Sequence, residues 1–403
     1  MANTGLSDAK NAKSDEFYTQ YFDIEAEMNA YVEFNPDVFR GKTILLPCDD
    51  PEWSNFTKYF ACNFERLGLK KLISTSYAKG AANKQLTLFE EQSPLYDAKK
   101  HDTHGKLFVL THDTDGSGNI DMDDIEFSGY LEGDGDFRSE EVCKLRDEAD
   151  IIITNPPFSK FRIFLSWIME AKKKFIIIGN INCITYKEVF PLLKDNKVWL
   201  GYSIHSGDRK FNVPDDYPLE AAGCGIDADG KKYIRVKGVR WFTNIDHGGR
   251  HEELLLDTMA HNLKFNKRLK KKFSDYGTDK YLCFDNYDAL EVPFTECIPS
   301  DYDGVMGVPI TFLDKYNPNQ FEIVGGSMYE DTPCRILKKY VEEGYKFFKS
   351  DGVTVSGSGA LRDKISPKIP SKGNSDFSVS PDGKFLSSIY QRIFIRHKKG
   401  GNF

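Results

Sequence analysis

The stretch ADIIITNPPFSKF, residues 149–161, decides the fold because it joins a buried strand to an unusual turn. Its apolar run, Ile151–Thr154, is typical of a parallel strand whose two faces are both covered by helices. The run stops at Asn155-Pro156-Pro157-Phe158. Prolines fix φ and remove backbone donors. Carbonyl oxygens at this turn are therefore expected to accept hydrogen bonds from outside the chain.

Similar apolar runs recur around this stretch and alternate with amphipathic segments. That alternation predicts parallel strands joined by helices, an α/β fold with a doubly wound, mostly parallel sheet. Ligands of such sheets bind beyond the carboxyl ends of the strands. The expected strands are KTILLPC (42–48), KKLISTSY (70–77), ADIIITN (149–155) and KFIIIGN (174–180), and the expected helices are 56–68, 140–149 and 161–173.

The length of 403 residues predicts two domains, and we place their boundary near residue 225. Residues 1–225 form the α/β domain and residues 226–403 an α+β module. In the module, HEELLLDTMAHNLKFNKRLKKKF (251–273) predicts a helix, and GVPITFL, FEIVGG and YQRIFIRHK predict strands. Residues 351–383, rich in Gly, Ser and Pro, predict a flexible loop.

Composition excludes several classes of protein. The eight cysteines form no Cys-x-x-Cys pair, which fits neither a disulfide framework nor a zinc site. No signal peptide or membrane span is indicated, so we expect a cytoplasmic protein without a membrane partner. The net charge of −7 is unevenly distributed. Residues 101–150 carry 15 acidic and 4 basic residues, whereas residues 231–280 carry 13 basic and 6 acidic ones, so an anionic partner would bind the second stretch.

The turn combines groups that suit an aromatic amine. Asn155 offers a side-chain acceptor, Pro156 a carbonyl, and Phe158 a flat apolar face for a planar heterocycle. If the two acceptors bind both hydrogens of an exocyclic amine, its nitrogen can pyramidalise and direct its lone pair at an electrophilic methyl group. Positioning would supply most of the catalysis. A plain strand-terminating proline turn is the structural alternative.

The turn matches the Asn-Pro-Pro-Phe/Tyr signature of amino-methyltransferases. Taken whole, the chain resembles the EcoRI-type adenine-specific DNA methyltransferases, from about residue 15 through DNYDAL (285–290) and MGVPITFLDKYNPNQFEIVG (306–325). The resemblance implies a Rossmann-like S-adenosylmethionine-dependent core in residues 1–225 and a target-recognition region in residues 226–403. It also implies methyl transfer to N6 of a flipped-out adenine at a specific DNA sequence, with Asn155, Pro156, Pro157 and Phe158 as the catalytic residues.

The resemblance also assigns residues to S-adenosylmethionine. GDGDFRSEE (133–141) resembles an acidic-aromatic element that holds the adenine of the cofactor, and LLPCDDPEWSNF (45–56) stands where related enzymes carry a glycine-rich loop. The second segment lacks glycine, which departs from the usual pattern. The implied cofactor-binding residues are Phe17, Tyr18, Thr19, Pro47, Cys48, Asp49, Ser54, Asn55, Ser76, Asp136 and Phe137. Ordinary core packing is the alternative for the aromatic ones.

Two basic segments are candidates for DNA contacts. A flipped base costs a few kcal/mol, which phosphate contacts and wedging rings can offset. The candidates are Lys231, Lys232, Arg235, Lys237, Arg240 and Trp241 in the first segment, and Lys267, Arg268, Lys270, Lys271 and Lys272 in the second. A solvated helix face is the alternative for the second segment.

Two other signals are discounted. DTDGSGNIDMDD (113–124) has the spacing of a calcium-binding loop, but its flanks do not read as paired helices, so we expect an acidic hairpin and no metal. Pro47-Cys48 resembles the nucleophile of cytosine-C5 methyltransferases, but amine methylation needs no covalent intermediate, and Cys48 is interpreted as a packed thiol.

Several alternatives remain open. N4-cytosine methylation uses the same amine chemistry, and Asn-Pro-Pro also occurs in protein-glutamine methyltransferases. A catalytically silent DNA-binding protein and a calcium-responsive module are rivals from other classes. For the leading hypothesis, the expected partner is double-stranded DNA. A cognate restriction endonuclease would act separately, and the protein would be a monomer.

Overall fold

The computed structural model describes residues 17–47, 49–78, 93–213, 217, 219, 223–284, 286–329, 331–336, 343–348, 364–365, 377–379, 381–383, 385–388 and 390–398. The chain divides into two compact units, Met1–Gly248 and Gly249–Phe403. The division falls later than the predicted boundary near residue 225. The reason is that the basic aromatic run after residue 230 forms strands that pair within the first unit.

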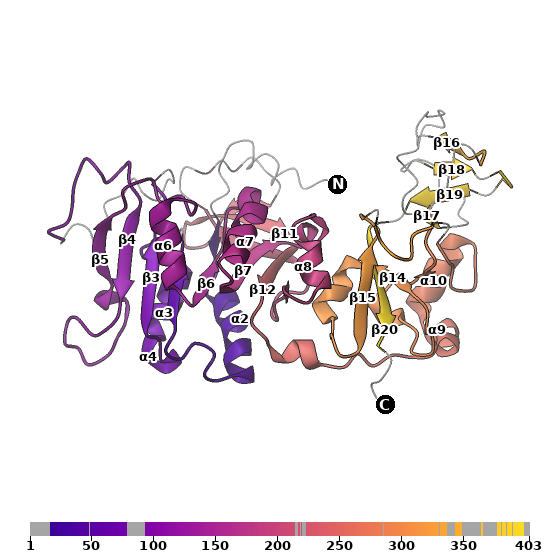
Figure 1. Cartoon of the computed structure of the whole chain (residues 1–403), viewed down its shortest axis with the longest axis horizontal. Helices are drawn as coiled ribbons and strands as arrows, with labels where there is room; N and C mark the ends of the chain where they lie inside the picture. The colour runs from indigo at the N-terminus through magenta and orange to yellow at the C-terminus, as the bar shows by residue number, and fades with distance from the viewer. Residues whose placement is uncertain are drawn as a thin grey trace. The chain divides into compact units, whose positions relative to one another are not determined.

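An eight-stranded sheet forms the centre of the first unit (Figure 1). Its buried strands coincide with the apolar runs of the sequence. In spatial order the strands are β5 (Glu126–Tyr130), β4 (Lys106–Leu110), β3 (Lys71–Thr75), β2 (Thr43–Leu46), β6 (Ile151–Thr154), β7 (Lys174–Asn180), β12 (Val239–Thr243) and β8 (Trp199–Leu200).

The sheet is mixed, whereas a mostly parallel one was predicted. The pairs β2–β3, β2–β6 and β6–β7 are parallel. The pairs β3–β4, β4–β5, β7–β12 and β8–β12 are antiparallel. Parallel neighbours need a long crossover, whereas antiparallel ones can be joined by a hairpin. Parallel pairing is therefore confined to the centre, where helices follow the strands.

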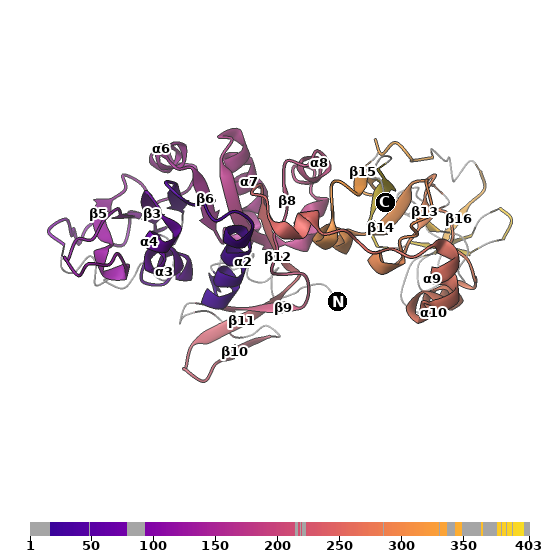
Figure 2. The same ribbon diagram turned by 90° about the horizontal axis from the view of Figure 1, so that it is seen from below.

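Helices cover both faces of this sheet, which explains why β2 and β6 are buried along their whole length. Figure 2 shows α6 and α7 on one face and α2 and α3 on the other. No helix in the described ranges is long and apolar enough to cross a membrane. The helices of this unit are α2 (Tyr21–Phe34), α3 (Asn55–Cys62), α4 (Phe64–Leu67), α6 (Glu140–Glu148), α7 (Phe161–Glu170) and α8 (Phe190–Lys194).

A smaller antiparallel sheet belongs to the same unit. Its order is β1 (Tyr18–Thr19), β9 (Asp208–Asn212), β11 (Lys232–Lys237) and β10 (Cys224–Ile226). In β11, Ile234 and Val236 are buried, whereas Arg235 and Lys237 are exposed. This alternation follows the two-residue period of a strand with one buried face.

The second unit contains a four-stranded sheet with an ion pair in its interior. Its order is β13 (Leu290–Glu291), β14 (Met306–Pro309), β20 (Arg392–His397) and β15 (Phe321–Gly326). FEIVGG and YQRIFIRHK form strands as predicted, whereas GVPITFL is a strand only up to Pro309, because Ile310–Lys315 form a 3-10 helix. Arg392 Nη2 and Nε donate to the two carboxylate oxygens of Glu291 at 2.8 and 3.1 Å.

Another small sheet in this unit overlaps the predicted flexible loop. Its strands are β16 (Lys346–Phe348), β18 (Phe377–Val379), β19 (Phe385–Ser388) and β17 (Lys364–Ile365). Within 351–383, the structure describes β17, β18 and residues 381–383, and the rest of that prediction lies outside the described residues.

Residues 251–273 form two helices where one was predicted. They are α9 (Met259–Phe265) and α10 (Lys267–Tyr276), separated by Asn266. The Asn266 side chain accepts a hydrogen bond from Leu269 N at 2.9 Å, which caps α10 and interrupts the continuous helix. Upstream, Gln320 bonds the N–H and the carbonyl of Leu254, which lies in the non-helical residues 252–258.

Candidate active site

Asn155 lies at the carboxyl end of β6, at the edge where the parallel strands end. The next two residues are prolines, and a short turn over Phe158–Lys160 then leads into α7. Asn155 Nδ2 donates to the carbonyl of Phe17 at 2.6 Å. Its Oδ1 is shielded from solvent and has no hydrogen-bond partner in the part of the chain that the structure describes. The side chain thus presents one unsatisfied acceptor.

The two prolines differ in how their carbonyls are used. Pro157 O accepts a hydrogen bond from Lys160 N at 2.8 Å and closes the turn. In the described part of the chain, no donor bonds the carbonyl of Pro156. Two acceptors of consecutive residues, Asn155 Oδ1 and Pro156 O, therefore lack partners. An unsatisfied buried acceptor costs about 1–3 kcal/mol, and such groups call for a functional explanation.

The Phe158 ring belongs to an aromatic cluster. Its centroid lies 5.6 Å from that of Phe17 and 6.3 Å from that of Phe211, both in edge-on contacts. Tyr217 packs against Phe17 at 6.3 Å. Phe158 is only 8% exposed. The open stacking face expected from the sequence is thus occupied by protein rings in this structure, and a base could stack there only after the cluster separated.

Asp49 organises the carboxyl end of β2. Its Oδ2 accepts from Thr154 Oγ1 at 2.6 Å and its Oδ1 from Ser54 Oγ at 2.7 Å. Thr154 Oγ1 also lies 3.0 Å from the carbonyl of Pro47. Burial raises the pKa of Asp49 to about 7, although the two hydroxyl donors oppose this rise. The glycine-free segment is therefore held by side-chain hydrogen bonds; Cys48 lies outside the described residues.

The segment Phe17–Thr19 crosses the same edge of the sheet. Tyr18 and Thr19 pair with Asn212 and Phe211 of β9. On the other side, Asn55 Nδ2 at the start of α3 donates to Thr19 O at 2.7 Å. Thr19 Oγ1 is buried without a hydrogen-bond partner. The structure thus brings Phe17, Thr19, Asn55 and Asn155 together, from three widely separated parts of the sequence.

Ser76 and Asp136 lie on neighbouring loops. A β-carbon added to Gly135 would lie 2.3 Å from Ser76 O, so only glycine permits this approach. Ser76 Oγ accepts from Lys106 N at 3.1 Å. Asp136 accepts three hydrogen bonds from Arg138, and Lys160 Nζ lies 3.5 Å away. The Arg138 guanidinium holds the pKa of the Asp136 carboxyl well below its usual range.

Phe137 is placed differently from its prediction. The ring is 2% exposed and packs against Phe164 and Trp167 of α7, at centroid distances of 4.9 and 5.5 Å. The expectation that it packs on a cofactor ring is corrected, because the ring is buried against these two rings and the Arg138 guanidinium lies over it, 5.6 Å from its centroid. An aromatic residue next to an acidic one gives the same sequence pattern in both cases.

The first basic segment includes two residues that were wrongly assigned to DNA. Trp241 is 1% exposed, and its ring meets that of Phe56 at 6.0 Å. Arg240 is 4% exposed and donates to the carbonyls of Val239 and His205. Both belong to β12 in the central sheet, where Trp241 packs against Phe56 of α3 and Arg240 donates to backbone carbonyls. In the sequence they closely follow the exposed basic residues of β11. The change from the surface strand β11 to the buried strand β12 was therefore not recognised.

The remaining basic residues of this segment reach the surface to different extents. Lys231, Arg235 and Lys237 are exposed, and Arg235 pairs with Asp208 at 3.2 Å. Lys232 is half-buried, and its Nζ donates to the carbonyl of Tyr217 at 3.1 Å. Contacts of these residues with DNA remain predictions.

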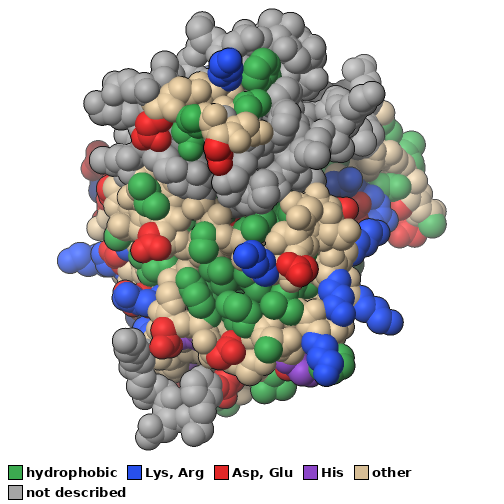
Figure 3. Space-filling model, turned by 90° about the vertical axis from the view of Figure 1, so that its right-hand side faces the viewer, with side chains coloured by type: hydrophobic (Ala, Val, Ile, Leu, Met, Phe, Trp, Pro, Cys, Tyr) green, Lys and Arg blue, Asp and Glu red, His purple; other side chains and the backbone are tan. Residues whose placement is uncertain are grey.

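The second basic segment is an amphipathic helix. Leu269, Phe273 and Tyr276 form the buried side of α10. Arg268 is exposed, pairs with Glu296 at 2.7 Å and lies over the Phe294 ring. Lys267, Lys270 and Lys271 are exposed, and Lys272 is half-buried. Figure 3 shows Lys and Arg side chains along the margin of one face, around a central apolar patch.

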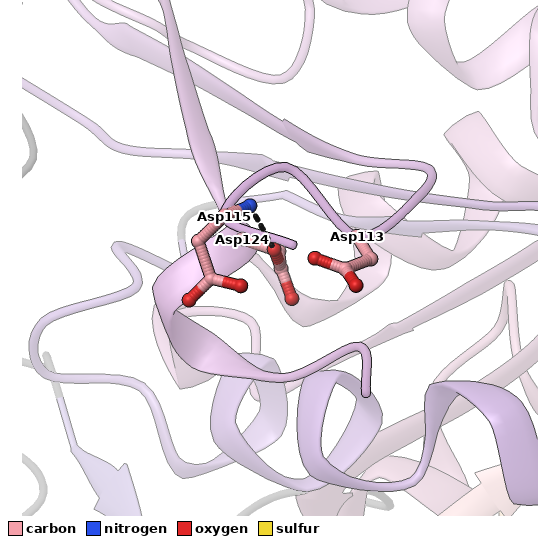
Figure 4. Close-up of side chains that lie close together, drawn as sticks. All are labelled: Asp113, Asp115 and Asp124. Carbon is pink, nitrogen blue, oxygen red and sulfur yellow. Dashed lines mark hydrogen bonds between the residues drawn. The ribbon is translucent and has the colours of Figure 1, made fainter. Parts of the chain in front are cut away.

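The acidic loop forms the predicted hairpin, since it joins the antiparallel strands β4 and β5. Side-chain oxygens of Asp113, Asp115 and Asp124 lie within 4.8 Å of one another (Figure 4). They accept from the loop's own backbone. Asp113 bonds the N–H groups of Gly116 and Gly118 at 2.6 and 2.7 Å.

Several residues of the site were not identified from the sequence. Thr154 links Asp49 to β6, Phe211 and Tyr217 complete the aromatic cluster, and Arg138 and Lys160 neutralise Asp136. A polar residue ending an apolar strand immediately before Asn155 was the available signal for Thr154. Phe211 and Tyr217 lie in a turn-rich region whose pairing with residues 18–19 has no sequence signature.

The turn at the end of a parallel strand, with two unsatisfied acceptors, fits the class of amino-methyltransferases that the Asn-Pro-Pro-Phe signature indicates. A family model described as adenine-specific methyltransferase EcoRI matches residues 5–398. The chain belongs to this family and is an adenine-specific methyltransferase. This family membership confirms the resemblance that was proposed from the Asn-Pro-Pro-Phe turn and the surrounding sequence.

Individual relatives agree with this assignment. The Type II methyltransferase M.EcoRI of Escherichia coli is 44% identical over 322 residues, covering 80% of this chain and 89% of that protein. The Type II methyltransferase M.MpnI of Mycoplasma pneumoniae is 34% identical over 322 residues, covering 78% and 83%. M.MgeORF184P of Mycoplasma genitalium is 33% identical over 318 residues, covering 78% and 84%. No solved structure matches the chain.

Proposed function

We propose that the protein transfers a methyl group from S-adenosylmethionine to N6 of a flipped-out adenine at a specific sequence in duplex DNA. One observation carries this proposal: Asn155 Oδ1 is buried and unsatisfied beside the unbonded carbonyl of Pro156. The matched relatives are Type II methyltransferases, which supports DNA as the substrate. The family description favours adenine over the N4-cytosine alternative.

The proposed mechanism follows from these two acceptors. Asn155 Oδ1 and Pro156 O each accept one hydrogen of the adenine amine, which localises the lone pair of N6. Bound S-adenosylmethionine would supply an electrophilic methyl group on a sulfonium. The nitrogen–carbon bond would form as the carbon–sulfur bond breaks, which would leave S-adenosylhomocysteine as a neutral thioether, and the extra proton on N6 would pass to solvent. Asn155 and Pro156 hold the amine so that most of the rate acceleration comes from orientation.

The edge of the sheet supports a cofactor site in part. We infer a Rossmann-like core from the parallel order β3-β2-β6-β7, because ligands of such sheets bind at the carboxyl ends of the strands. The buried, unpartnered Thr19 Oγ1 offers a donor and an acceptor at this edge. Thr19 and Ser54, with the loops of Ser76 and Asp136, would hold the cofactor. Asp136 could do so only by sharing oxygens that Arg138 already bonds.

Product analysis tests the reaction. Purified protein, tritiated S-adenosylmethionine and bacterial genomic DNA lacking adenine methylation should give labelled N6-methyladenine after digestion to nucleosides. Label in N4-methylcytosine would show that cytosine, not adenine, is the methylated base. Bound cofactor without any labelled nucleoside would favour a catalytically silent DNA-binding protein.

We propose that the second unit recognises DNA through α10. Removing one protein–phosphate interaction flattens the slope of log affinity against log salt by about 0.9. The variant Lys270→Ala/Lys271→Ala/Lys272→Ala should therefore bind duplex DNA more weakly and with a salt slope flatter by about 2–3. The control is the variant Lys194→Ala/Lys197→Ala, which also removes lysine charges but outside α10. Unchanged affinity and slope in the triple variant would exclude α10.

A further inference from the structure

We infer that Asn55 is a positioning residue for methyl transfer, which acts on Asn155 through the segment Phe17–Thr19. The sequence alone assigned Asn55 to cofactor contact. The structure instead shows its side-chain amide donating to Thr19 O at 2.7 Å, two residues from the Phe17 carbonyl that accepts from Asn155. This inference rests on the proposed function, because it concerns how the Asn155 acceptor is oriented.

The orientation of the Asn155 amide is set by chemistry. A backbone carbonyl can only accept hydrogen bonds, so the Phe17 oxygen requires the NH₂ group of Asn155 to face it. The side-chain oxygen must then point the other way, where it has no partner. If the Phe17 carbonyl moved away, the amide could rotate and present two hydrogens to the adenine amine, which would repel it. The catalytic acceptor therefore depends on the position of one carbonyl.

That carbonyl belongs to a short segment held from two sides. On one side, Tyr18 and Thr19 pair with β9. On the other side, two amides bond it: Asn55 at Thr19 O and Asn155 at Phe17 O. The Phe17 carbonyl orients the Asn155 amide, so a bond from Asn155 alone would leave that carbonyl held on this side only by the group that it orients. Asn55 supplies the second anchor, from the first turn of α3.

Asn55 is well placed to act as a fixed anchor. It directly follows Ser54, whose Oγ caps α3 by accepting from Phe56 N and Thr57 N at 3.1 and 3.3 Å. The same hydroxyl donates to Asp49, which is bonded to Thr154, the neighbour of Asn155. Both amides thus extend from one hydrogen-bonded edge of the sheet. Release of the segment would change their relative positions without moving this edge.

The variants separate positioning from cofactor contact. Asn55→Asp keeps the shape of the side chain but removes the donor to Thr19 O, and a carboxylate in the first turn of a helix is favourable for folding. Asn55→Gln keeps an amide donor on a longer side chain. Lys58→Ala, an exposed change on the same helix, is the control. The readouts are the single-turnover rate with tritiated S-adenosylmethionine and unmethylated genomic DNA, and the dissociation constants of cofactor and DNA.

We expect Asn55→Asp to lower the transfer rate about tenfold, the effect of losing one hydrogen bond to a positioned group, with both dissociation constants unchanged within about twofold. Asn55→Gln should recover part of the rate, and Lys58→Ala should match the wild type. In an Asn155→Asp background, which also lacks the donor to Phe17 O, Asn55→Asp should have an effect below about twofold.

Three outcomes would overturn the inference. A cofactor dissociation constant raised about tenfold with an unchanged transfer rate would make Asn55 a cofactor contact. An equal loss of rate with and without Asn155→Asp would show that the two amides act independently. A wild-type rate in Asn55→Asp would remove any role of the anchor while leaving the proposed function intact. Absence of transfer by the wild type itself would overturn both proposals.

Discussion

Two polar loops leave the same eight-stranded sheet, and they differ in whether their acceptors are satisfied. In the acidic loop, Asp113 and Asp124 accept hydrogen bonds from nearby backbone N–H groups. At the Asn155 turn, one buried side-chain oxygen has no hydrogen-bond partner among the described residues. Carboxylates that bond their own loop stabilise its conformation, whereas an unsatisfied acceptor requires a ligand to complete it. A motif in the sequence does not distinguish these two situations.

The largest effect should follow removal of the unsatisfied acceptor. Asn155→Ala should lower the single-turnover rate by about 10²–10³-fold, the usual cost of losing one preorganised hydrogen-bonding group. Asn35→Ala, the same substitution at an exposed residue that ends α2, is the matched control. A rate for Asn155→Ala within threefold of the control would contradict the importance of this oxygen.

A smaller effect, on the pH dependence of the unfolding free energy, is expected from Asp49, whose buried carboxylate oxygens both accept hydrogen bonds. Its folded-state pKa of about 7 lies above the unfolded value, so the group contributes most stability below about pH 4 and loses it as pH rises through 7. Between pH 4 and 8, the unfolding free energy of the wild type should fall relative to Asp49→Asn, by at most about 4 kcal/mol. Urea unfolding at each pH would measure this, and parallel curves would refute it.

Asp124 should matter for stability but not for catalysis. Asp124→Ala removes the bonds to Thr114 N and Asp121 N, at 2.6 and 2.9 Å. It should lower the unfolding free energy by about 1–3 kcal/mol and leave the transfer rate unchanged. Asp123→Ala, at an exposed neighbour, is the control. A tenfold loss of transfer in Asp124→Ala would remove the distinction between the two loops.

The smallest effect is expected from calcium. Because the carboxylates already accept backbone hydrogen bonds, 1 mM calcium should leave the melting temperature unchanged relative to a chelator control, within about 1 °C. Differential scanning calorimetry would measure this. A rise of several degrees that disappears in Asp113→Asn would show that the acidic loop is also an incomplete site.

The sequence was informative where a local pattern has one structural solution. The apolar runs ending in Leu46 and Thr154 predicted parallel strands correctly, because burial on both faces leaves a continuous signal. The Asn-Pro-Pro-Phe turn identified the family through its resemblance to the amino-methyltransferase signature, which the family model confirms. The edge strands were not assigned as antiparallel, because pairing direction depends on distant segments.

The failures at the site have a shared cause. Trp241 and Lys237 are close in sequence, yet one lies in the central sheet and the other is exposed on the small one. Phe158 was correctly placed in the turn, but its packing against Phe211 depends on a strand much later in the chain. The bond from Asn55 to Thr19 is likewise a tertiary contact without a local pattern. Residue type indicated the chemistry, whereas long-range packing decided which groups remain accessible.

Asn266 both follows α9 and caps α10, so one half-buried amide sets the direction in which a row of lysines points. Replacing it with a strong helix former would join the two helices into a single rod and carry those lysines along the axis of α9, at about 1.5 Å per residue. The direction in which these lysines point could therefore change in evolution, or by engineering, without any substitution of the lysines themselves.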